Sequence, residues 1–186
     1  LIQTVAAAIG LGEKIIYRGQ EIGLASPWDR ISVKDAFEFY APISMAKATE
    51  RNLFDEIMVR DIEPRLGIKK PTFICDYPVQ RRAMARLKRE DETVAERFEL
   101  YIGGLELANA FSELVDPEEQ RRHFHLENEE RRLLGKPIYP IPEQFLEELE
   151  GMPPSAGIAL GVDRLVMALL DVATIDKVVA FTPEEL

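Results

Sequence analysis

The 186-residue sequence predicts an α+β fold, because helical and strand-forming segments alternate along it. Two segments carry this prediction. Residues 94–114 contain two strand-forming runs around Gly103-Gly104, a dipeptide that supplies the positive φ angles of a tight hairpin turn. Residues 50–62 place apolar side chains at helical spacing. No repeat and no long linker separates the segments, so a single domain is expected.

The first half of the chain contains three predicted helices and one strand. The first helix begins at Leu1 without a capping residue, whereas Ser32 and Asp35 form a capping box at the start of the second. The third helix covers 50–62 and stops before a proline, since a residue that precedes proline avoids the helical region. The run 71–78 is short, β-branched and aromatic, so it is predicted as a strand.

The second half begins with the hairpin, whose strands are predicted at 94–102 and 105–114. Pro117 opens a long charged helix that ends at Gly135, and Pro142 opens a shorter helix. The remaining predicted elements are a strand at 157–160, a helix at 161–170 and a final strand at 177–181.

Composition and charge narrow the possible functions. A hydrophobic content of 46% supports one buried core, and no apolar run approaches the roughly 18 residues of a membrane span. The net charge of -10 argues against a nucleic-acid-binding platform, since such proteins usually present a basic face. Cys75 is the single cysteine, so no internal disulfide is possible and a reducing cytoplasm is expected. The basic residues of 81–89 are expected on a solvated loop or helix face.

The predicted hairpin places acidic side chains together. With Gly103 and Gly104 as the loop residues, Tyr101 pairs with Glu106, and the period of two puts Glu99 on the same face. Like charges at that separation repel unless a cation bridges them, and Mg2+ suits carboxylates when phosphate oxygens complete its shell. The alternative is a solvent-facing hairpin that carries two unrelated glutamates.

Three further side chains of the second hairpin strand have the opposite parity. In a regular strand, Asn109, Phe111 and Glu113 face away from Glu106. They join its face only if an extra residue forms a bulge between 107 and 110, where small alanines leave room for one. Otherwise they lie on the other face of the sheet, and the spacing alone leaves both arrangements open.

Three strings of residues resemble the active site of a known family. The strings RFELYIGG at 97–104, ELANAFSEL at 106–114 and GIALGVDRL at 157–165 are similar to those of class II lysyl-tRNA synthetases and their shorter relatives. The last string resembles motif 3, at 157–170. The resemblance implies an antiparallel sheet flanked by helices, binding of ATP and Mg2+, and formation of an aminoacyl adenylate. Motifs 1 and 2 are not visible, so residues 1–186 are expected to be the C-terminal portion of a catalytic domain, inactive by itself.

The resemblance implies a nucleotide site and a metal site. Glu99 and Glu106 match the carboxylates that bind Mg2+ and ATP. Arg164 matches the motif 3 arginine that lies against adenine and reaches the terminal phosphate, tasks that suit a planar cation. Arg164 and Glu106 are therefore the expected catalytic residues, and Gly161 is expected to let the backbone approach the nucleotide closely.

The resemblance also implies an amino-acid pocket. Asn109, Phe111 and Glu113 match its residues, with Glu113 facing the substrate ammonium and Phe111 packing along the aliphatic stem. Gly157 is expected to let the backbone approach the amino acid closely. Ala159 is expected to border the same pocket.

Two alanines distinguish this sequence from typical lysyl-tRNA synthetases. Ala159 and Ala108 replace glycines, which resembles the elongation factor P lysine ligases, paralogues without an anticodon-binding domain that transfer (R)-β-lysine to a lysine of that factor. An added methyl in a tight pocket discriminates by roughly 1 to 3 kcal/mol, enough to bias α- against β-amino acid. We therefore favour a lysine or β-lysine ligase with elongation factor P as its partner, homodimeric at full length. The alternatives are the catalytic half of a lysyl-tRNA synthetase, with tRNA as partner, and a non-catalytic synthetase-like regulator.

Overall fold

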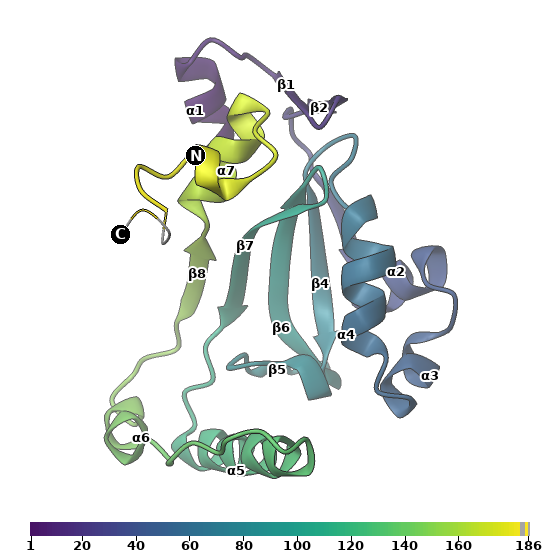
Figure 1. Cartoon of the computed structure of the whole chain (residues 1–186). Coiled ribbons are helices and arrows are strands. Elements are labelled where there is room, and N and C mark those ends of the chain that lie inside the picture. The colour runs from purple at the N-terminus through teal and green to yellow at the C-terminus, as the bar shows by residue number, and fades with distance from the viewer. Residues whose placement is uncertain (183–184, 186) are drawn as a thin grey trace.

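The computed structural model describes residues 1–182 and 185. Within them, a six-stranded sheet has the order β3-β4-β6-β7-β8, and the short β5 pairs with β6 (Figure 1). A separate hairpin is formed by β1 and β2. The strands are β1 Lys14–Tyr17, β2 Gln20–Gly23, β3 Asp29–Ser32, β4 Thr72–Pro78, β5 Leu87–Lys88, β6 Asp91–Ile102, β7 Leu105–Ser112 and β8 Ala156–Leu160. The pairings are antiparallel apart from that of β3 with β4, which is parallel.

Helices flank the sheet. They are α1 Ile2–Ala8, α2 Val33–Tyr40, α3 Met45–Glu50, α4 Phe54–Ile57, α5 Pro117–Leu133, α6 Glu143–Leu149 and α7 Val162–Leu170. A π-helical turn, η1 (Met58–Ile62), continues α4, and the 3-10 turns are η2 (Glu63–Arg65), η3 (Val79–Arg81) and η4 (Ile175–Lys177). Figure 1 shows α5 and α6 beyond one end of the long strands, with α1 and α7 toward the other end. None of the helices in the described part of the chain is both long and apolar enough to cross a membrane.

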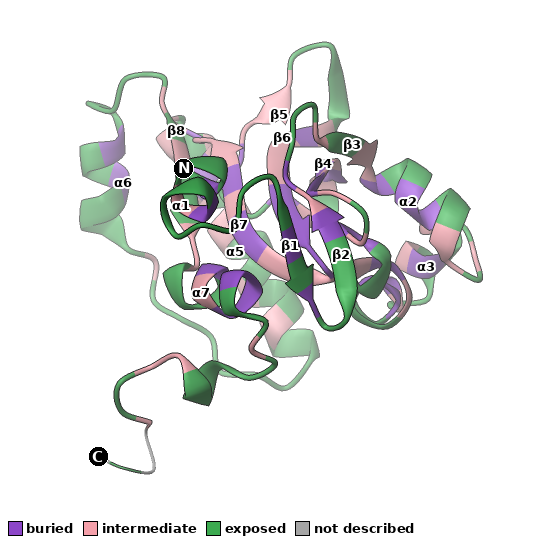
Figure 2. Ribbon diagram, turned by 90° about the horizontal axis from the view of Figure 1, so that it is seen from above, coloured by how far each residue is buried: buried purple, intermediate pink, exposed green. Residues whose placement is uncertain are grey.

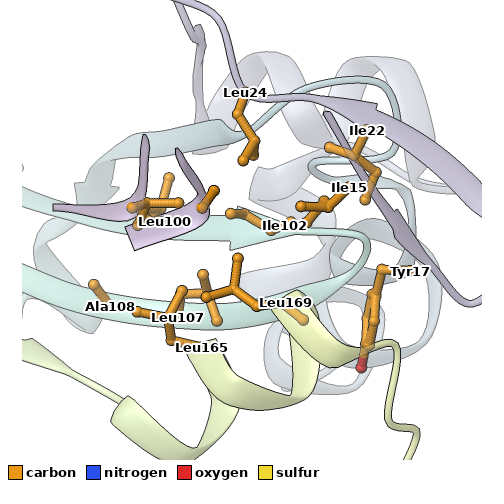
Figure 3. Close-up of a cluster of buried hydrophobic side chains, with 13 residues drawn as sticks. Ile15, Tyr17, Ile22, Leu24, Leu100, Ile102, Leu107, Ala108, Leu165 and Leu169 are labelled. Carbon is orange, nitrogen blue, oxygen red and sulfur yellow. The ribbon is translucent and has the colours of Figure 1, made fainter. Parts of the chain in front are cut away.

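Two apolar cores lie on opposite faces of the sheet. One joins α1, the β1–β2 hairpin and α7 to Leu100, Leu107 and Ala108 (Figure 3). The other packs α2, α4 and η1 against Ile74 and Tyr101. Figure 2 shows α2 and α7 each buried along one side and exposed along the other, as expected of helices that cover a sheet. This arrangement confirms the predicted α+β class with an antiparallel sheet flanked by helices.

The helical cover of the second face is incomplete. Ile74 of β4, Glu99 of β6, Asn109 of β7 and Ala159 of β8 are cross-strand neighbours in one row. Along this row the exposure rises, because Ile74 is fully buried, Asn109 is half-buried and Ala159 is exposed. The contacts of α2 with the sheet are with β3 and β4, so the part of this face formed by β7 and β8, which carries Asn109 and Ala159, is its more open half.

Local sequence signals explain the ends of several elements. The Ser32 hydroxyl accepts a hydrogen bond from the Asp35 amide at 3.0 Å and caps α2. Gly103 and Gly104 form the hairpin turn with φ angles of +58° and +74°. The helix α5 ends before Gly135, whose φ is +66°. The predictions of this cap, this turn and this helix are confirmed, as are those of β4, α6, β8 and α7.

The predicted strand at 177–181 is wrong. The chain there leaves η4 and continues as a turn and bends. The amides of Val178 and Val179 donate to the carbonyl oxygen of Ile175 at 3.0 and 3.2 Å. A strand needs a neighbouring strand for its backbone groups, and here local turn hydrogen bonds satisfy them instead.

Three further features differ from expectation. The predicted helix at 50–62 is not continuous, because α3 ends at Glu50, and helical structure resumes as α4 at Phe54 and as the π-helical turn η1 at Met58. The sequence pattern did not predict β1, β2 or β3, although Arg18 and Gly19, both with positive φ, mark the β1–β2 turn. The basic segment 81–89 is solvated only in part, since Arg89 is exposed whereas Arg82 is 7% exposed and pairs with Glu119 at 2.5 Å. Pairing of these cations with distant carboxylates depends on the fold, so the local charge run did not reveal it.

Candidate active site

A bulge in β7 decides the geometry of the site. Leu100 pairs with Ala108, whereas the next residue, Tyr101, pairs with Glu106, so Leu107 has no partner in β6. The side chain of Leu107 is 1% exposed and lies in an apolar core. The extra residue shifts the alternation, and the residues after it return to the face of Glu106. Of the two arrangements that the spacing left open, the structure therefore has the one with a bulge between 107 and 110.

The bulge brings the predicted amino-acid residues onto one face. Glu99, Asn109 and Ala159 form one cross-strand row, and Phe111 and Gly157 are partners in the next row. The amide nitrogen Nδ2 of Asn109 donates to Oε1 of Glu99 at 3.3 Å. The alternative arrangement, in which Asn109 lies on the opposite face from the carboxylates, is thereby excluded.

Gly157 makes room for Glu113. The backbone of Glu113 is fixed after β7 by a bridge with Ala85 and by donation of its amide to the Ser155 carbonyl at 2.9 Å. A Cβ added at Gly157 would collide with the Glu113 carboxylate. The close approach at Gly157 is therefore made by a side chain of the site, and close approach to a bound amino acid stays a prediction.

The start of α7 places Arg164 beside Glu106. Gly161 caps this helix, and its amide donates to the carbonyl of the bulge residue Leu107 at 2.8 Å. From the first turn, Nη1 of Arg164 donates to the carbonyl oxygen of Glu106 at 2.9 Å and to its Oε2 at 3.1 Å. The two side chains are 45% and 36% exposed, and such exposed pairs contribute little to stability. Arg164 and Glu106 are therefore together and free to exchange their contact for a ligand.

Gly161 itself shows no steric need for glycine. A Cβ added there would lie 3.4 Å from Cδ of Arg164, which is an ordinary van der Waals contact. The predicted role of Gly161 in nucleotide binding therefore rests on its place at the start of α7, where its amide donates to the carbonyl oxygen of Leu107.

Glu99 has different surroundings from Glu106. It is 7% exposed, and its Oε1 accepts from Nη2 of Arg97 at 2.6 Å while its Oε2 accepts from the Tyr101 hydroxyl at 2.9 Å. Burial, and then the charge of Glu99, raises the pKa of Tyr101, which therefore remains a donor. Within the described residues, no three His, Cys, Asp or Glu side chains gather as a metal site. Two carboxylates suit Mg2+ when phosphate oxygens supply further ligands.

Glu63 is a neighbouring carboxylate that the sequence pattern did not reveal. Burial raises the pKa of Glu63, and the charges of Glu99 and Glu106 raise it further. It belongs to η2, which contacts β7 and packs against the hairpin turn at Gly104. The two segments are far apart in the sequence, so no local signal links them.

A hollow of about 430 Å³ lies against the same strands but on the reverse face. Its lining includes Cys75, Phe98, Ala110 and Ile158, which form the cross-strand row next to that of Glu99 and therefore point the other way. Burial raises the pKa of the Cys75 thiol, which makes it a poor nucleophile at neutral pH. The lining also includes Arg97, Phe111 and Gly157, so the hollow borders the candidate active site from the reverse face of the sheet.

Comparison with known proteins sets these features in a family. The model of the family described as tRNA synthetases class II (D, K and N) matches residues 1–185. The chain belongs to this class II tRNA synthetase family. Its mixed sheet, mostly antiparallel, and its flanking helices are those of a class II synthetase domain, as the resemblance implied.

Relatives of this class II chain include three proteins named elongation factor P (R)-β-lysine ligase. The protein from Proteus mirabilis is 47% identical over 137 residues, 72% of this chain and 42% of that relative. The protein from Photorhabdus laumondii is 48% identical over 122 residues, 65% of this chain and 38% of that relative. The protein from Erwinia tasmaniensis is 38% identical over 186 residues, 88% of this chain and 57% of that relative. The class II chain thus spans between 38% and 57% of the length of these relatives.

Proposed function

We propose that this chain is the amino-acid- and nucleotide-binding part of an ATP-dependent ligase that activates lysine or (R)-β-lysine for transfer to elongation factor P. The bulge at Leu107 carries this proposal, because it puts Asn109 and Phe111 on the face of Glu99 and Glu106. The names of the three relatives support the same substrate and acceptor. The neighbouring carboxylates and Arg164 support the use of ATP with Mg2+.

The amino acid binds on the open half of the sheet face. The Glu113 carboxylate pairs with the substrate ammonium, and Phe111 packs along the aliphatic stem. Asn109 supplies a hydrogen bond from the neighbouring row, and Gly157 keeps the space that Glu113 needs. A buried pair of opposite charges with good geometry favours a substrate that carries an ammonium group at the far end of an apolar chain.

Activation joins the amino acid to AMP. An oxygen of the substrate carboxylate attacks the α-phosphorus of ATP, the bond from this phosphorus to the bridging oxygen breaks, and pyrophosphate leaves. Arg164 lies against adenine and neutralises the terminal phosphate, in exchange for its contact with Glu106. When bound, Mg2+ neutralises phosphate charge, and Glu99 and Glu106 are the residues that hold it. An amine of the acceptor then attacks the acyl carbon, loses a proton and releases AMP.

Ala159 is the residue on which the choice of amino acid depends. It is exposed on the open half of the face and is the cross-strand neighbour of Asn109. Ala108, in contrast, is 2% exposed and lies in the apolar core on the reverse face. Of the two alanines that distinguish this sequence from lysyl-tRNA synthetases, Ala159 is the one in the row of Glu99 and Asn109, which supports its place at the proposed pocket.

The test compares two Ala→Gly variants of the full-length protein. Ala159→Gly should raise pyrophosphate exchange with α-lysine relative to (R)-β-lysine by about tenfold or more, since one methyl in a close-fitting site discriminates by roughly 1 to 3 kcal/mol. Ala108→Gly is the matched control, and its ratio should equal that of the wild type. An unchanged ratio in Ala159→Gly would make a lysyl-tRNA synthetase the better interpretation. Absence of exchange by the wild type with both amino acids would contradict the proposed function.

We further infer that the full-length protein is a homodimer in the cytoplasm. The family resemblance supports the dimer, and the single free cysteine, Cys75, suits a reducing compartment. Light scattering of the full-length protein tests the dimer, and a mass equal to one chain would contradict it.

A further inference from the structure

Arg97 is held from four sides in the floor of the site. Its Nη2 donates to Oε1 of Glu99 at 2.6 Å, its Nη1 to the carbonyl oxygen of Arg81 at 2.7 Å, and its Nε to Oδ1 of Asn109 at 3.3 Å. The guanidinium carbon lies 4.2 Å from the centroid of the Tyr77 ring. The side chain is only 15% exposed, so the planar cation has one position rather than several.

This position fixes the orientation of the Asn109 amide. A guanidinium only donates hydrogen bonds and an ionised carboxylate only accepts them. The amide of Asn109 contacts both, so its oxygen must face Arg97 and its nitrogen must face Glu99, as observed. One N–H of Asn109 is used by Glu99, and the second remains for a ligand. Asn109 therefore presents a donor to the bound amino acid, which suits a carboxylate or carbonyl oxygen and not the ammonium.

The same guanidinium holds the carboxylate of Glu99. Oε1 accepts from Arg97 and Asn109, and Oε2 accepts from the Tyr101 hydroxyl. A carboxylate that is 7% exposed has lost most of its water, so these donors satisfy its oxygens and hold it in place. Arg97 thus touches one residue proposed for the metal and one proposed for the amino acid.

We propose that Arg97 is a positioning residue that links the two halves of the site. It directs the Asn109 donor at an oxygen of the amino acid, and it holds the Glu99 carboxylate in the place from which it serves the nucleotide-bound metal. This inference rests on the proposed function. Its signature is a joint change in amino-acid affinity and in Mg2+ dependence when the guanidinium alone is removed.

The experiment uses three variants of the full-length protein. Arg97→Met keeps the unbranched stem and removes all donors, and Arg97→Lys keeps the charge without the fork. Arg86→Met is the matched control, because Arg86 bonds Glu96 at 2.7 Å and Glu96 faces the reverse side of β6. Pyrophosphate exchange is titrated with amino acid at saturating ATP and with Mg2+ at saturating amino acid. Calorimetry measures amino-acid binding without nucleotide, and thermal unfolding reports the fold of each variant.

Arg97→Met should raise the amino-acid KM and the calorimetric Kd by about tenfold or more, and should raise the Mg2+ concentration for half-maximal rate. Arg97→Lys should restore the Mg2+ dependence, because its charge still faces Glu99, while amino-acid affinity stays weak. Arg86→Met should leave both parameters unchanged.

A lower melting temperature with both parameters of Arg97→Met within about twofold of the wild type would reduce Arg97 to a structural residue and overturn the proposal. If Arg97→Met changed only the amino-acid affinity or only the Mg2+ dependence, the link between the two halves would be disproved. If Arg97→Met does not fold, Arg97→Lys decides, and a wild-type amino-acid Kd in that variant overturns the proposal. Absence of pyrophosphate exchange by the wild-type protein would instead contradict the proposed function. Failure of the proposal for Arg97 and failure of the proposed function are therefore distinguishable.

Discussion

At the scale of the residue, the candidate site depends on small residues that leave space for polar and charged side chains. Gly157 leaves room for the carboxylate of Glu113, and Ala159 is exposed next to Asn109. Glu106 and Arg164 are exposed enough to exchange partners, whereas Glu99 is enclosed by three donors. The two carboxylates assigned to one metal therefore differ in freedom, with Glu99 fixed and Glu106 free to turn toward a ligand.

Gly157→Ala should weaken amino-acid binding without unfolding the protein. The new Cβ meets the end of a flexible side chain, so Glu113 can move away at little cost in stability, but its carboxylate then no longer faces the substrate ammonium. We expect the amino-acid KM of the full-length protein to rise by about tenfold or more, because one hydrogen bond to a charged group is lost. Gly151→Ala is the control, since a Cβ there meets no atom closer than 3.6 Å. Equal KM values for the two variants would show that Glu113 does not contact the substrate.

Glu63→Gln should stabilise the protein at high pH and not at low pH. Burial and the charges of Glu99 and Glu106 raise the pKa of Glu63 in the folded state. Above that raised pKa the charged Glu63 opposes folding, whereas below its ordinary value of 4.5 it is neutral in both folded and unfolded states. The melting temperature of the variant should therefore exceed that of the wild type at about pH 8, with the difference vanishing near pH 4.

Thermal unfolding of both proteins across this pH range measures the difference. The exposed Glu147→Gln is the control and should show no such trend. A wild type that is the more stable protein at pH 8 would show that its surroundings stabilise the charged form of Glu63, which is the opposite of a raised pKa.

At the scale of the element, the bulge in β7 and the start of α7 form one unit. At the bulge, the Leu107 side chain lies in the core and its carbonyl oxygen accepts a hydrogen bond from the Gly161 amide. The helix α7 begins there and places Arg164 beside Glu106. The extra residue therefore fixes both the face of Asn109 and the position of the motif 3 arginine.

Leu107→Ala should destabilise the protein by about 2 to 5 kcal/mol, the range for truncating a fully buried leucine to alanine. Leu107 is 1% exposed among the residues of α7 and the β1–β2 hairpin. Urea denaturation monitored by circular dichroism measures the free energy of unfolding. Leu126→Ala on α5 is the control, because Leu126 is 67% exposed and should change stability by less than about 0.5 kcal/mol. A similar small effect at Leu107 would mean that the bulge residue does not hold the two elements together.

At the scale of the whole molecule, a class II sheet carries the candidate site on the face that bears Glu99 of β6, Asn109 of β7 and Ala159 of β8. The chain matches the family model over residues 1–185 and spans between 38% and 57% of the length of its curated relatives. The face formed by β6, β7 and β8 provides carboxylates, an amide and one motif 3 arginine. The resemblance implies a motif 2 arginine that grips the α-phosphate, and we expect that residues 1–186 do not supply it.

The isolated 186-residue chain should therefore not catalyse amino-acid-dependent pyrophosphate exchange. One missing donor to a developing negative charge typically costs about 2.7 to 4 kcal/mol in the transition state. Exchange assays on the purified chain and on the full-length protein, at equal concentration, make the comparison. Comparable rates would show that the residues of this chain suffice for activation.

The sequence by itself determined the hairpin, its turn and the long helix α5, because these depend on local properties. Gly103 and Gly104 supply positive φ angles, Ser32 caps a helix, and apolar spacing places the core side of each element. The strings around Glu99, Glu113 and Arg164 also sufficed to indicate the family. The pairing of Tyr101 with Glu106 followed from the turn alone, and the structure confirms it.

Only the tertiary structure decided which side chains meet. The alternation of side chains along the strand allowed Asn109 on either face, and the bulge at Leu107 determines which face it takes. The bulge is stable because Leu107 enters a core built by α1, α7 and the β1–β2 hairpin. The hydrogen bond of Arg97 to the Arg81 carbonyl and the approach of Glu63 to Glu99 likewise depend on segments that are distant in the chain. Burial and hydrogen-bond pairing between such segments are not local properties, so they appear only when the chain is folded.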